Sequence, residues 1–273
     1  MFTDLPSIAR LRPPLLLVGM GTGSDFARPI PPYDDTATAQ IRLLHEKAMA
    51  SAVRDQTTAD RLTAIGVRTT CIGCPVTFFS DDTIASADPT LPLLVSLPPG
   101  RILKGLSGRI VGRMFLTQTV RYIAWLKARG VPTVVTLHEP GDIAVARAWL
   151  PEDVDVFYTD KIDELIRRYR DSRGVIGFRL HAALLGLGLG KPVIPAWVDW
   201  RGRAFVETFG LQPMAVRPGR PGEFRKLRHW TERLLAGSPE LIAPLAHAKA
   251  RFQARYHSFL ADTAACFRMR ALR

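Results

Sequence analysis

Short runs of apolar residues alternate with longer amphipathic segments along this chain of 273 residues. Runs that are apolar at every position are typical of parallel strands, because such strands are buried on both faces. The pattern predicts strands at residues 15–19, 70–72, 93–97, 133–137, 154–157, 175–177 and 192–194. Apolar residues at the spacing of one helix face predict helices at residues 36–53, 57–65, 110–129, 142–149, 161–170, 180–189 and 201–209. Strands that alternate with helices in this way favour an α/β fold with parallel sheets.

The polar, turn-rich segment 79–91 predicts a linker that divides the chain. We expect a short N-terminal α/β unit over residues 1–82 and a fuller α/β domain with an anion site over residues 90–222. Residues 223–273 are expected to form basic amphipathic helices.

A long helix is predicted at the C-terminal end. Ser238 and Pro239 are a capping residue followed by proline, which suits the first helical position. Apolar or small residues then recur on one helix face: Leu241, Leu245, Phe252, Tyr256, Phe259, Thr263 and Phe267. We expect this face to pack against the body of the protein. The Lys and Arg residues of the same segment also suit a membrane surface, so peripheral membrane contact through the basic C-terminus stays open as an alternative.

The chain is strongly basic. It has 37 Lys and Arg against 25 Asp and Glu, a formal net charge of +12, which favours acidic partners such as phosphates, nucleotides or anionic lipids. A nucleic-acid partner is not expected, because no nucleic-acid-binding module is recognisable and aromatic residues are not interleaved with the basic ones. With three cysteines, no signal peptide and no uninterrupted apolar span, we expect a cytoplasmic protein, with membrane association left open.

Two cysteines form a C-x-x-C motif at Cys71 and Cys74. A zinc site would need two further ligands nearby, and the sequence has no second cysteine pair. We therefore expect buried structural thiols and no metal site.

Polar residues follow several of the predicted strands. Gly21 belongs to a glycine-rich turn after the first strand, and His138 and Glu139 follow the strand at 133–137. Ligands of open α/β sheets bind beyond the carboxyl ends of the strands, so both positions are candidates for substrate contact. The turn lacks the third glycine of the dinucleotide-binding fingerprint, which disfavours a dinucleotide cofactor.

The sharpest cluster is Arg179, Leu180 and His181, between the strand at 175–177 and the following helix. A cation, an imidazole and a helix N-terminus together suit an anion and proton transfer to it. Arg201 follows the next strand, so we expect Arg179, His181 and Arg201 to converge on one small anion.

At these residues the chain resembles the polysaccharide pyruvyl transferase family. Four stretches carry the resemblance: Arg54 to Thr58 with Leu62 and Gly66; Gly73-Cys74-Pro75; Arg179-Leu180-His181; and Gly190-Lys191-Pro192-Val193 followed by Asp199-Trp200-Arg201. The resemblance implies a GT-B-like fold, in which two Rossmann-like parallel-sheet units face a cleft. Because the chain begins almost at the glycine-rich strand, we expect the first unit to be truncated.

The resemblance also implies an activity: transfer of pyruvate from phosphoenolpyruvate to a pair of sugar hydroxyls as a ketal, in polysaccharide or glycan biosynthesis. Phosphoenolpyruvate would be the donor substrate, a sugar or lipid-linked glycan the acceptor, and no cofactor or metal would be needed. His181 would be the catalytic acid, and Arg179, Leu180 and Arg201 would bind substrate. Arg101 is the candidate to replace an anion-binding arginine that many members carry near the position of Pro98.

Two other functions are compatible with the sequence. A GT-B glycosyltransferase that uses a nucleotide sugar would need a carboxylate for the ribose, for which Asp163 and Glu164 are candidates. A non-catalytic, glycan-binding relic of the family would fit a shortened first unit, but it leaves Arg179, His181 and Arg201 without a role.

Overall fold

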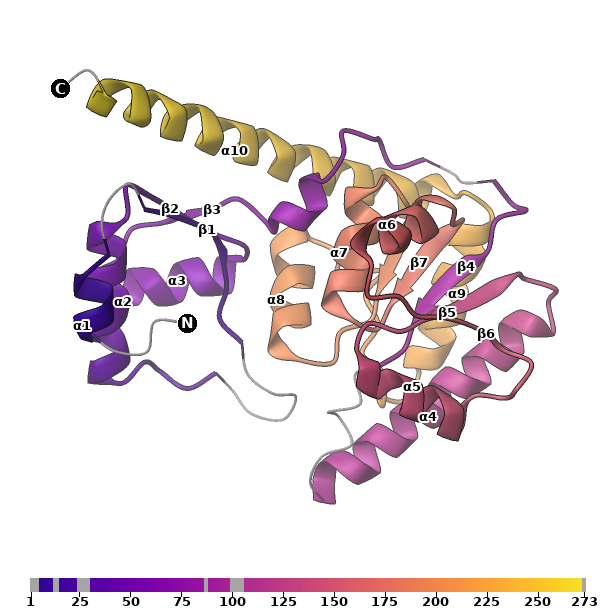
Figure 1. Ribbon diagram of the computed structural model, residues 1–273. Coiled ribbons are helices and arrows are strands. Elements are labelled where there is room, and N and C mark those ends of the chain that lie inside the picture. The colour runs from indigo at the N-terminus through magenta and orange to yellow at the C-terminus, as the bar shows by residue number, and fades with distance from the viewer. Residues whose placement is uncertain (1–4, 12–14, 24–29, 86–87, 99–105, 272–273) are drawn as a thin grey trace.

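The computed structural model describes residues 5–11, 15–23, 30–85, 88–98 and 106–271. Their strands form two sheets (Figure 1). The first has the order β1 (Leu16–Met20), β2 (Ala50–Val53) and β3 (Thr70–Cys71). The second has the order β6 (Asp155–Phe157), β5 (Thr133–Thr136), β4 (Leu93–Ser96), β7 (Gly174–Gly177) and β8 (Val193–Pro195). Every pairing is parallel, which confirms the predicted α/β fold.

Helices connect the strands within each sheet. The smaller sheet is accompanied by α1 (Leu5–Ala9), α2 (Asp35–Lys47) and α3 (Gln56–Ala64). The five-stranded sheet is accompanied by α4 (Leu106–Lys127), α5 (Pro140–Trp149), α6 (Ile162–Arg170), α7 (Leu180–Gly188) and α8 (Trp200–Phe209). The chain ends with α9 (Glu223–Leu235) and α10 (Pro239–Ala271), and the short 3₁₀ helix η1 (Pro75–Phe78) precedes segment 79–91, whose described residues form no helix or strand.

One predicted helix was wrong in its second half. The sequence pattern predicts a single helix over residues 36–53, whereas α2 ends at Lys47 and residues 50–53 form β2. Ala50, Ser51 and Ala52 have little intrinsic preference for strands. Their strand pairing is set by tertiary structure, since β2 lies between β1 and β3 and buries Ala52 and Val53 completely.

The larger sheet contains a topological switch point. From β4 the chain moves through α4, β5 and α5 to β6 on one side, and then returns through α6 to β7 and α7 to β8 on the other. Because such crossovers are right-handed, α4 and α5 lie on one face of the sheet and α6 and α7 on the other. The switch point lies between β4 and β7, where open α/β sheets place their ligand crevice.

The C-terminal helix α10 extends from the larger unit past the smaller one (Figure 1). Leu241, Leu245 and Phe252 are buried, and Tyr256 stacks on Phe78 of η1 with ring centroids 4.9 Å apart. The predicted apolar stripe thus packs against the body along this part of the helix. Lys249 is buried as well, and its ammonium donates to the carbonyl of Gly188, 3.0 Å away, at the end of α7.

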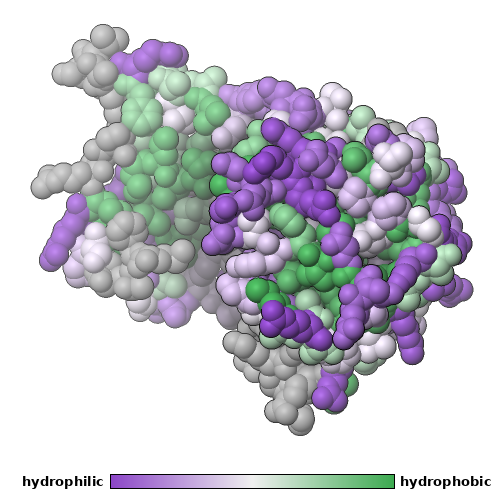
Figure 2. Space-filling view, turned by 45° about the vertical axis from the view of Figure 1, so that its right-hand side comes forward, coloured by the Kyte–Doolittle hydropathy of each residue, from purple (hydrophilic) through white to green (hydrophobic). Residues whose placement is uncertain are grey.

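Figure 2 shows polar residues over much of the right-hand part of this face, with an apolar area among them, and a broader apolar area at the left. Among the described residues, no helix is both long and apolar enough to cross a bilayer. Cys71 and Cys74 are buried in the core, and burial raises the pKa of both thiols. No group of three or more potential metal-ligating His, Cys, Asp or Glu side chains occurs in the described part of the chain.

Candidate functional site

A cavity of about 290 Å³ lies at the carboxyl edge of the five-stranded sheet. Its wall is made by residues that follow β5, β7 and β8, as expected for ligand sites of open α/β sheets. The sequence-predicted site residues His138, Glu139, Arg179, Leu180, His181 and Arg201 all line it. Gly21 is not among the described residues of the wall, and Arg101 lies outside the described residues.

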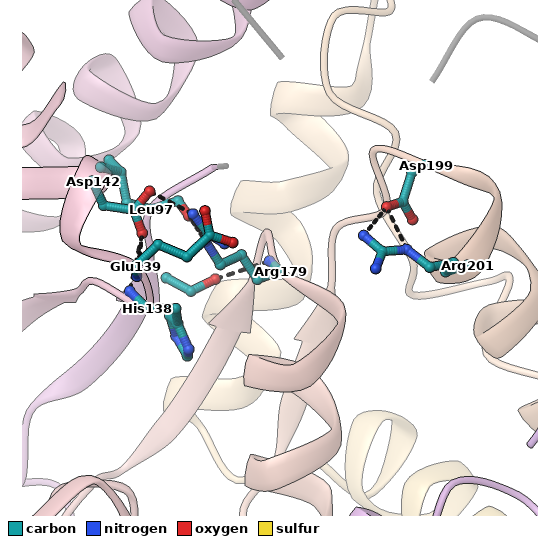
Figure 3. A network of polar contacts seen from close by, with 8 residues as sticks. Leu97, His138, Glu139, Asp142, Arg179, Asp199 and Arg201 are labelled. Atoms are coloured by element: carbon teal, nitrogen blue, oxygen red, sulfur yellow. Dashed lines mark hydrogen bonds and ion pairs between the residues drawn. The ribbon is translucent and has the colours of Figure 1, made fainter. Parts of the chain in front are cut away.

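Arg179 is held at the switch point by hydrogen bonds from four of its nitrogen atoms (Figure 3). Its backbone N–H donates to Oγ of Ser96, the last residue of β4, at 3.0 Å. Its Nε donates to the carbonyl of Leu97, the next residue, at 3.1 Å. Nη1 donates to Glu139 Oε1 at 2.8 Å, and Nη2 donates to Asp142 Oδ1. The side chain of Arg179 is only 10% exposed. Glu139 and Asp142 already neutralise this predicted anion-binding cation.

The two carboxylates differ in their surroundings. The Asp142 side chain is 1% exposed, and its second oxygen accepts the backbone N–H groups of His138 and Glu139 at 3.0 and 3.1 Å. The Glu139 side chain is 55% exposed. An incoming anion could therefore displace Glu139 from Arg179 at much lower cost than Asp142, since only Asp142 would be left buried without its partner.

His138 lies under this ion-pair network. Its Nε2 lies 3.1 Å from the hydroxyl of Tyr169, and its backbone is held by Asp142. Burial lowers the pKa of His138 to about 4, and the nearby charges of Arg179 and His181 act in the same direction. The imidazole of His138 is therefore neutral at physiological pH.

This depressed pKa predicts a pH dependence of stability. In unfolded protein the histidine takes up a proton near pH 6.5, whereas folded protein resists protonation down to about pH 4. The free energy of unfolding is therefore highest above pH 6.5, and roughly 1–3 kcal/mol of it is lost as the pH falls from 6.5 to about 4. Denaturation at a series of pH values measures the free energy of unfolding, which should change less steeply with pH in His138→Gln than in wild type. The same slope in both, or an equal change in the exposed-site control His229→Gln, would contradict the assignment.

His181 occupies the first turn of α7, and its exposed side chain lines the cavity. The N-cap residue of α7 is Arg179, which provides no side-chain hydrogen bond to the helix end. The backbone N–H groups of this first turn thus point toward the carboxyl edge of the sheet together with His181. A helix N-terminus in this position favours a bound anion.

Arg201 lies on the other side of the cavity, in the first turn of α8 (Figure 3). Its Nε and Nη2 both donate to Asp199 Oδ2, at 2.9 and 2.5 Å. The other Asp199 oxygen accepts the backbone N–H of Gly202 at 2.9 Å and caps the helix. Asp199 thereby fixes the guanidinium through one edge, and the side chain of Arg201 stays 29% exposed.

The glycine-rich loop after β1 approaches two arginines. A Cβ atom built on Gly21 would lie 2.1 Å from Nε of Arg54, and one built on Gly23 would lie 2.5 Å from Cγ of Arg201. A side chain at either position would force the neighbouring arginine side chain to move. Gly23 therefore brings the smaller unit against the Arg201 side of the cavity.

Arg54 is a residue of this region that was not predicted as a site residue. Its Nη2 donates to the carbonyl of Thr22 at 3.4 Å, and its Nε lies 3.3 Å from Asp55 Oδ2. Asp55 is buried and caps α3 by accepting the N–H of Thr58 at 2.7 Å, while Thr58 Oγ1 accepts the N–H of Thr22 at 2.8 Å. The segment from Arg54 to Thr58 thus positions the glycine-rich loop, which the motif alone did not indicate.

Asp163 and Glu164, the candidate ribose ligands, lie elsewhere. They belong to α6, and neither is among the described residues of the cavity wall. Glu164 accepts the hydroxyl of Thr159 at 2.8 Å and pairs with Lys161, and these hydrogen bonds lower its pKa.

Comparisons with known proteins agree with the fold. Sucrose-phosphate synthase from Thermosynechococcus elongatus is similar over 86% of this chain, with a TM-score of 0.51 and 16% identity. The MnaA protein of S. aureus, in a structure with UDP, is similar over 83% of this chain, with a TM-score of 0.50 and 11% identity. This chain spans 62% and 63% of the length of these two proteins. Both similarities show the GT-B-like fold that the sequence predicted.

A search of curated proteins found no significant match. A profile of polysaccharide pyruvyl transferases, in contrast, matches residues 14–199, which is more than half of the chain and includes the switch point, the cavity wall from His138 to Asp199 and the glycine-rich loop. The chain belongs to the polysaccharide pyruvyl transferase family.

Proposed function

We propose that the protein transfers pyruvate from phosphoenolpyruvate to two hydroxyl groups of a sugar, forming a ketal in the biosynthesis of a cell-surface polysaccharide or glycan. One observation carries this proposal. In a chain of this family, a single cavity at the switch point is lined by His181, the first turn of α7 and two arginines.

The donor would be bound as an anion. Phosphoenolpyruvate carries a phosphate and a carboxylate, and charge-assisted hydrogen bonds to arginine and to helix N–H groups suit both. Arg201 is 29% exposed and fixed on one edge by Asp199, so its remaining edge can bind an oxygen of the donor. Arg179 would bind a second anionic group by exchanging Glu139 for it, while Asp142 keeps the guanidinium in place.

The chemistry requires an acid near the donor. We infer that the imidazolium of His181 donates a proton to the methylene carbon of phosphoenolpyruvate while one sugar hydroxyl adds to the neighbouring carbon and releases its proton to solvent, from which the imidazole is reprotonated. The second hydroxyl then displaces phosphate from that carbon, and its proton leaves with the phosphate as HPO₄²⁻, which completes the ketal. Histidine is the side chain best suited to such transfer near neutral pH. The half-buried, neutral His138 would form part of the cavity wall.

The acceptor would approach from the side of the smaller unit. The glycine-rich loop lies against Arg201 there, and Arg54 lies against the same loop. We propose that a sugar or lipid-linked glycan is held between this loop, which includes Gly21, and the cavity. The identity of the sugar would be set by this half of the site.

Ligand-dependent stability tests the proposal, since a ligand that binds only folded protein raises its melting temperature. Phosphoenolpyruvate at millimolar concentration should raise the melting temperature, and UDP-sugars should not. A shift with a UDP-sugar alone would favour a glycosyltransferase. A shift with phosphoenolpyruvate but no phosphate release with any glycan acceptor would favour a non-catalytic relic.

Arg201 offers a graded test of donor binding. Arg201→Ala should weaken phosphoenolpyruvate binding by about 10-fold or more, because one charge-assisted contact is worth roughly 1.5–3 kcal/mol. Arg201→Lys should retain part of the affinity, since it keeps the charge but not the planar geometry. Titration of the melting temperature with phosphoenolpyruvate measures both. Arg203→Ala, which removes an exposed arginine of the same helix, is the matched control, and an equal loss there would contradict the assignment.

A further inference from the structure

The first turns of α4 present an apolar pair to solvent. Ile110 is 62% exposed and Met114 is 48% exposed, and a separation of four residues places them on the same helix face. The first large side chain of α4 that is buried among the described ones is Phe115, one residue beyond Met114. Figure 1 shows these first turns extending beyond the rest of the five-stranded unit. The apolar pair therefore lies outside the core of the protein.

The same region has a one-sided charge. Residues 89–138 contain seven Lys or Arg and no Asp or Glu. Arg113 is exposed next to Met114, and Arg121 is exposed further along the same stripe of α4. Arg179 and Arg201 are neutralised by nearby carboxylates, but this stretch of sequence contains no carboxylate of its own. Lys127 and Arg129, at the end of α4, pair with Asp153 and Glu232, so Arg113 and Arg121 are the cations that the described part of this stretch offers to a negatively charged surface.

We propose that the N-terminal half of α4 docks on an anionic lipid bilayer, with Ile110 and Met114 inserted at the level of the headgroups and Arg113 on the lipid phosphates. Exposed apolar residues flanked by arginine, without acidic residues, are typical of helices that lie in a membrane interface. Juxtaposed basic residues add attraction to acidic lipids. A second copy of this chain is disfavoured as the occupant, because two such surfaces would bring like charges together.

Docking of α4 would also orient the cavity. The chain leaves β4 at Ser96 and Leu97, whose oxygen atoms hold Arg179, and then continues toward the start of α4. The docked end of the helix therefore belongs to the same edge of the sheet as the cavity. If the proposed function holds, this arrangement places the cavity where a lipid-linked glycan acceptor would be available. The docking itself does not depend on pyruvate transfer.

Sedimentation with lipid vesicles tests the docking. Wild-type protein should co-sediment with vesicles of phosphatidylcholine mixed with phosphatidylglycerol, but not with phosphatidylcholine alone, and salt should weaken the binding. The double substitution Ile110→Ser with Met114→Ser, and separately Arg113→Glu, should each lower the apparent partition coefficient by about 10-fold. Both variants should keep the wild-type melting temperature shift with phosphoenolpyruvate, which separates this test from that of the proposed function.

Matched variants identify the surface. Ile162→Ser removes an isoleucine of the same 62% exposure on α6 and should bind vesicles like wild type. Arg268→Glu reverses an exposed charge on α10, and a loss of binding there without a loss in the α4 variants would assign the membrane contact to the C-terminal helix and overturn the proposal. Failure of wild type to bind the anionic vesicles would overturn it too, as would self-association that the α4 variants abolish.

Discussion

Replacing His181 with alanine is expected to lower the rate of pyruvate transfer by about 10²–10⁴-fold, the usual contribution of a positioned general acid. The loss should appear in turnover, because His181 is proposed to donate the proton that the methylene carbon receives. Binding of phosphoenolpyruvate should largely persist, since Arg201, Arg179 and the first turn of α7 remain. Phosphate release in the presence of glycan acceptors measures turnover, and the melting temperature shift with phosphoenolpyruvate measures binding.

His229 provides the control for this substitution. It is an exposed histidine of α9 and is not among the described residues of the cavity wall, so His229→Ala should leave both quantities unchanged. Unchanged turnover in His181→Ala would contradict the catalytic role. A parallel loss of stability and turnover would instead assign His181 a structural role.

Replacing Asp142 with alanine should lower the free energy of unfolding by about 3–5 kcal/mol, because it leaves the largely buried guanidinium of Arg179 without its buried partner. The backbone N–H groups of His138 and Glu139 would lose their acceptor as well, and α5 would lose half of its capping box. Equilibrium denaturation measures the loss. Asp142→Asn, which keeps the side-chain shape, should fold even if the alanine variant does not. Its free energy of unfolding should lie between those of wild type and Asp142→Ala.

Asp153 is the matched control, because it pairs with Lys127 and both side chains of this ion pair are exposed to solvent. Exposed pairs contribute about 1 kcal/mol or less, so Asp153→Ala should have little effect. A cost for Asp142→Ala no larger than that of the control would mean that Arg179 is not anchored by Asp142.

Most of the second sheet could be predicted from the sequence because of how it is buried. Leu93, Leu94 and Val95 of β4 are fully buried on both faces and therefore form an uninterrupted apolar run. The strand at 50–53 escaped prediction because it consists mainly of small residues whose conformation depends on neighbouring strands. The pattern of apolar residues therefore indicates a buried strand when the strand consists of large apolar residues, as β4 does, but not when it consists of small ones, as β2 does.

The location of the candidate site was also predictable, but its charge balance was not. His138, Arg179, His181 and Arg201 each follow a strand or begin a helix, and parallel strands bring those positions to one edge. The ion pair between Arg179 and Asp142 joins residues that are 37 positions apart, and no spacing rule indicates such a pair. The sequence thus predicted two anion-binding arginines, but it did not indicate that each is paired with a carboxylate, as the structure shows.

Contacts between the two units were the hardest to predict. Gly23 lies against Arg201 although 178 positions separate them, and Arg54 lies against Gly21. The sequence showed the glycines and the arginines but not their proximity, which depends on how the smaller unit is placed beside the larger one. The segment from Arg54 to Thr58 was nevertheless part of the family resemblance, and that was the signal that could have identified Arg54.

Mass spectrometry of a glycan acceptor tests most directly whether pyruvate passes from phosphoenolpyruvate to a sugar. After incubation in D₂O with the protein and phosphoenolpyruvate, an acceptor should gain one pyruvate with loss of one water. Its new methyl group should carry a solvent deuterium, and one phosphate should be released per product. An acceptor that instead gains a sugar from a nucleotide sugar, or phosphoenolpyruvate that stays intact with every acceptor tried, would contradict the proposed function.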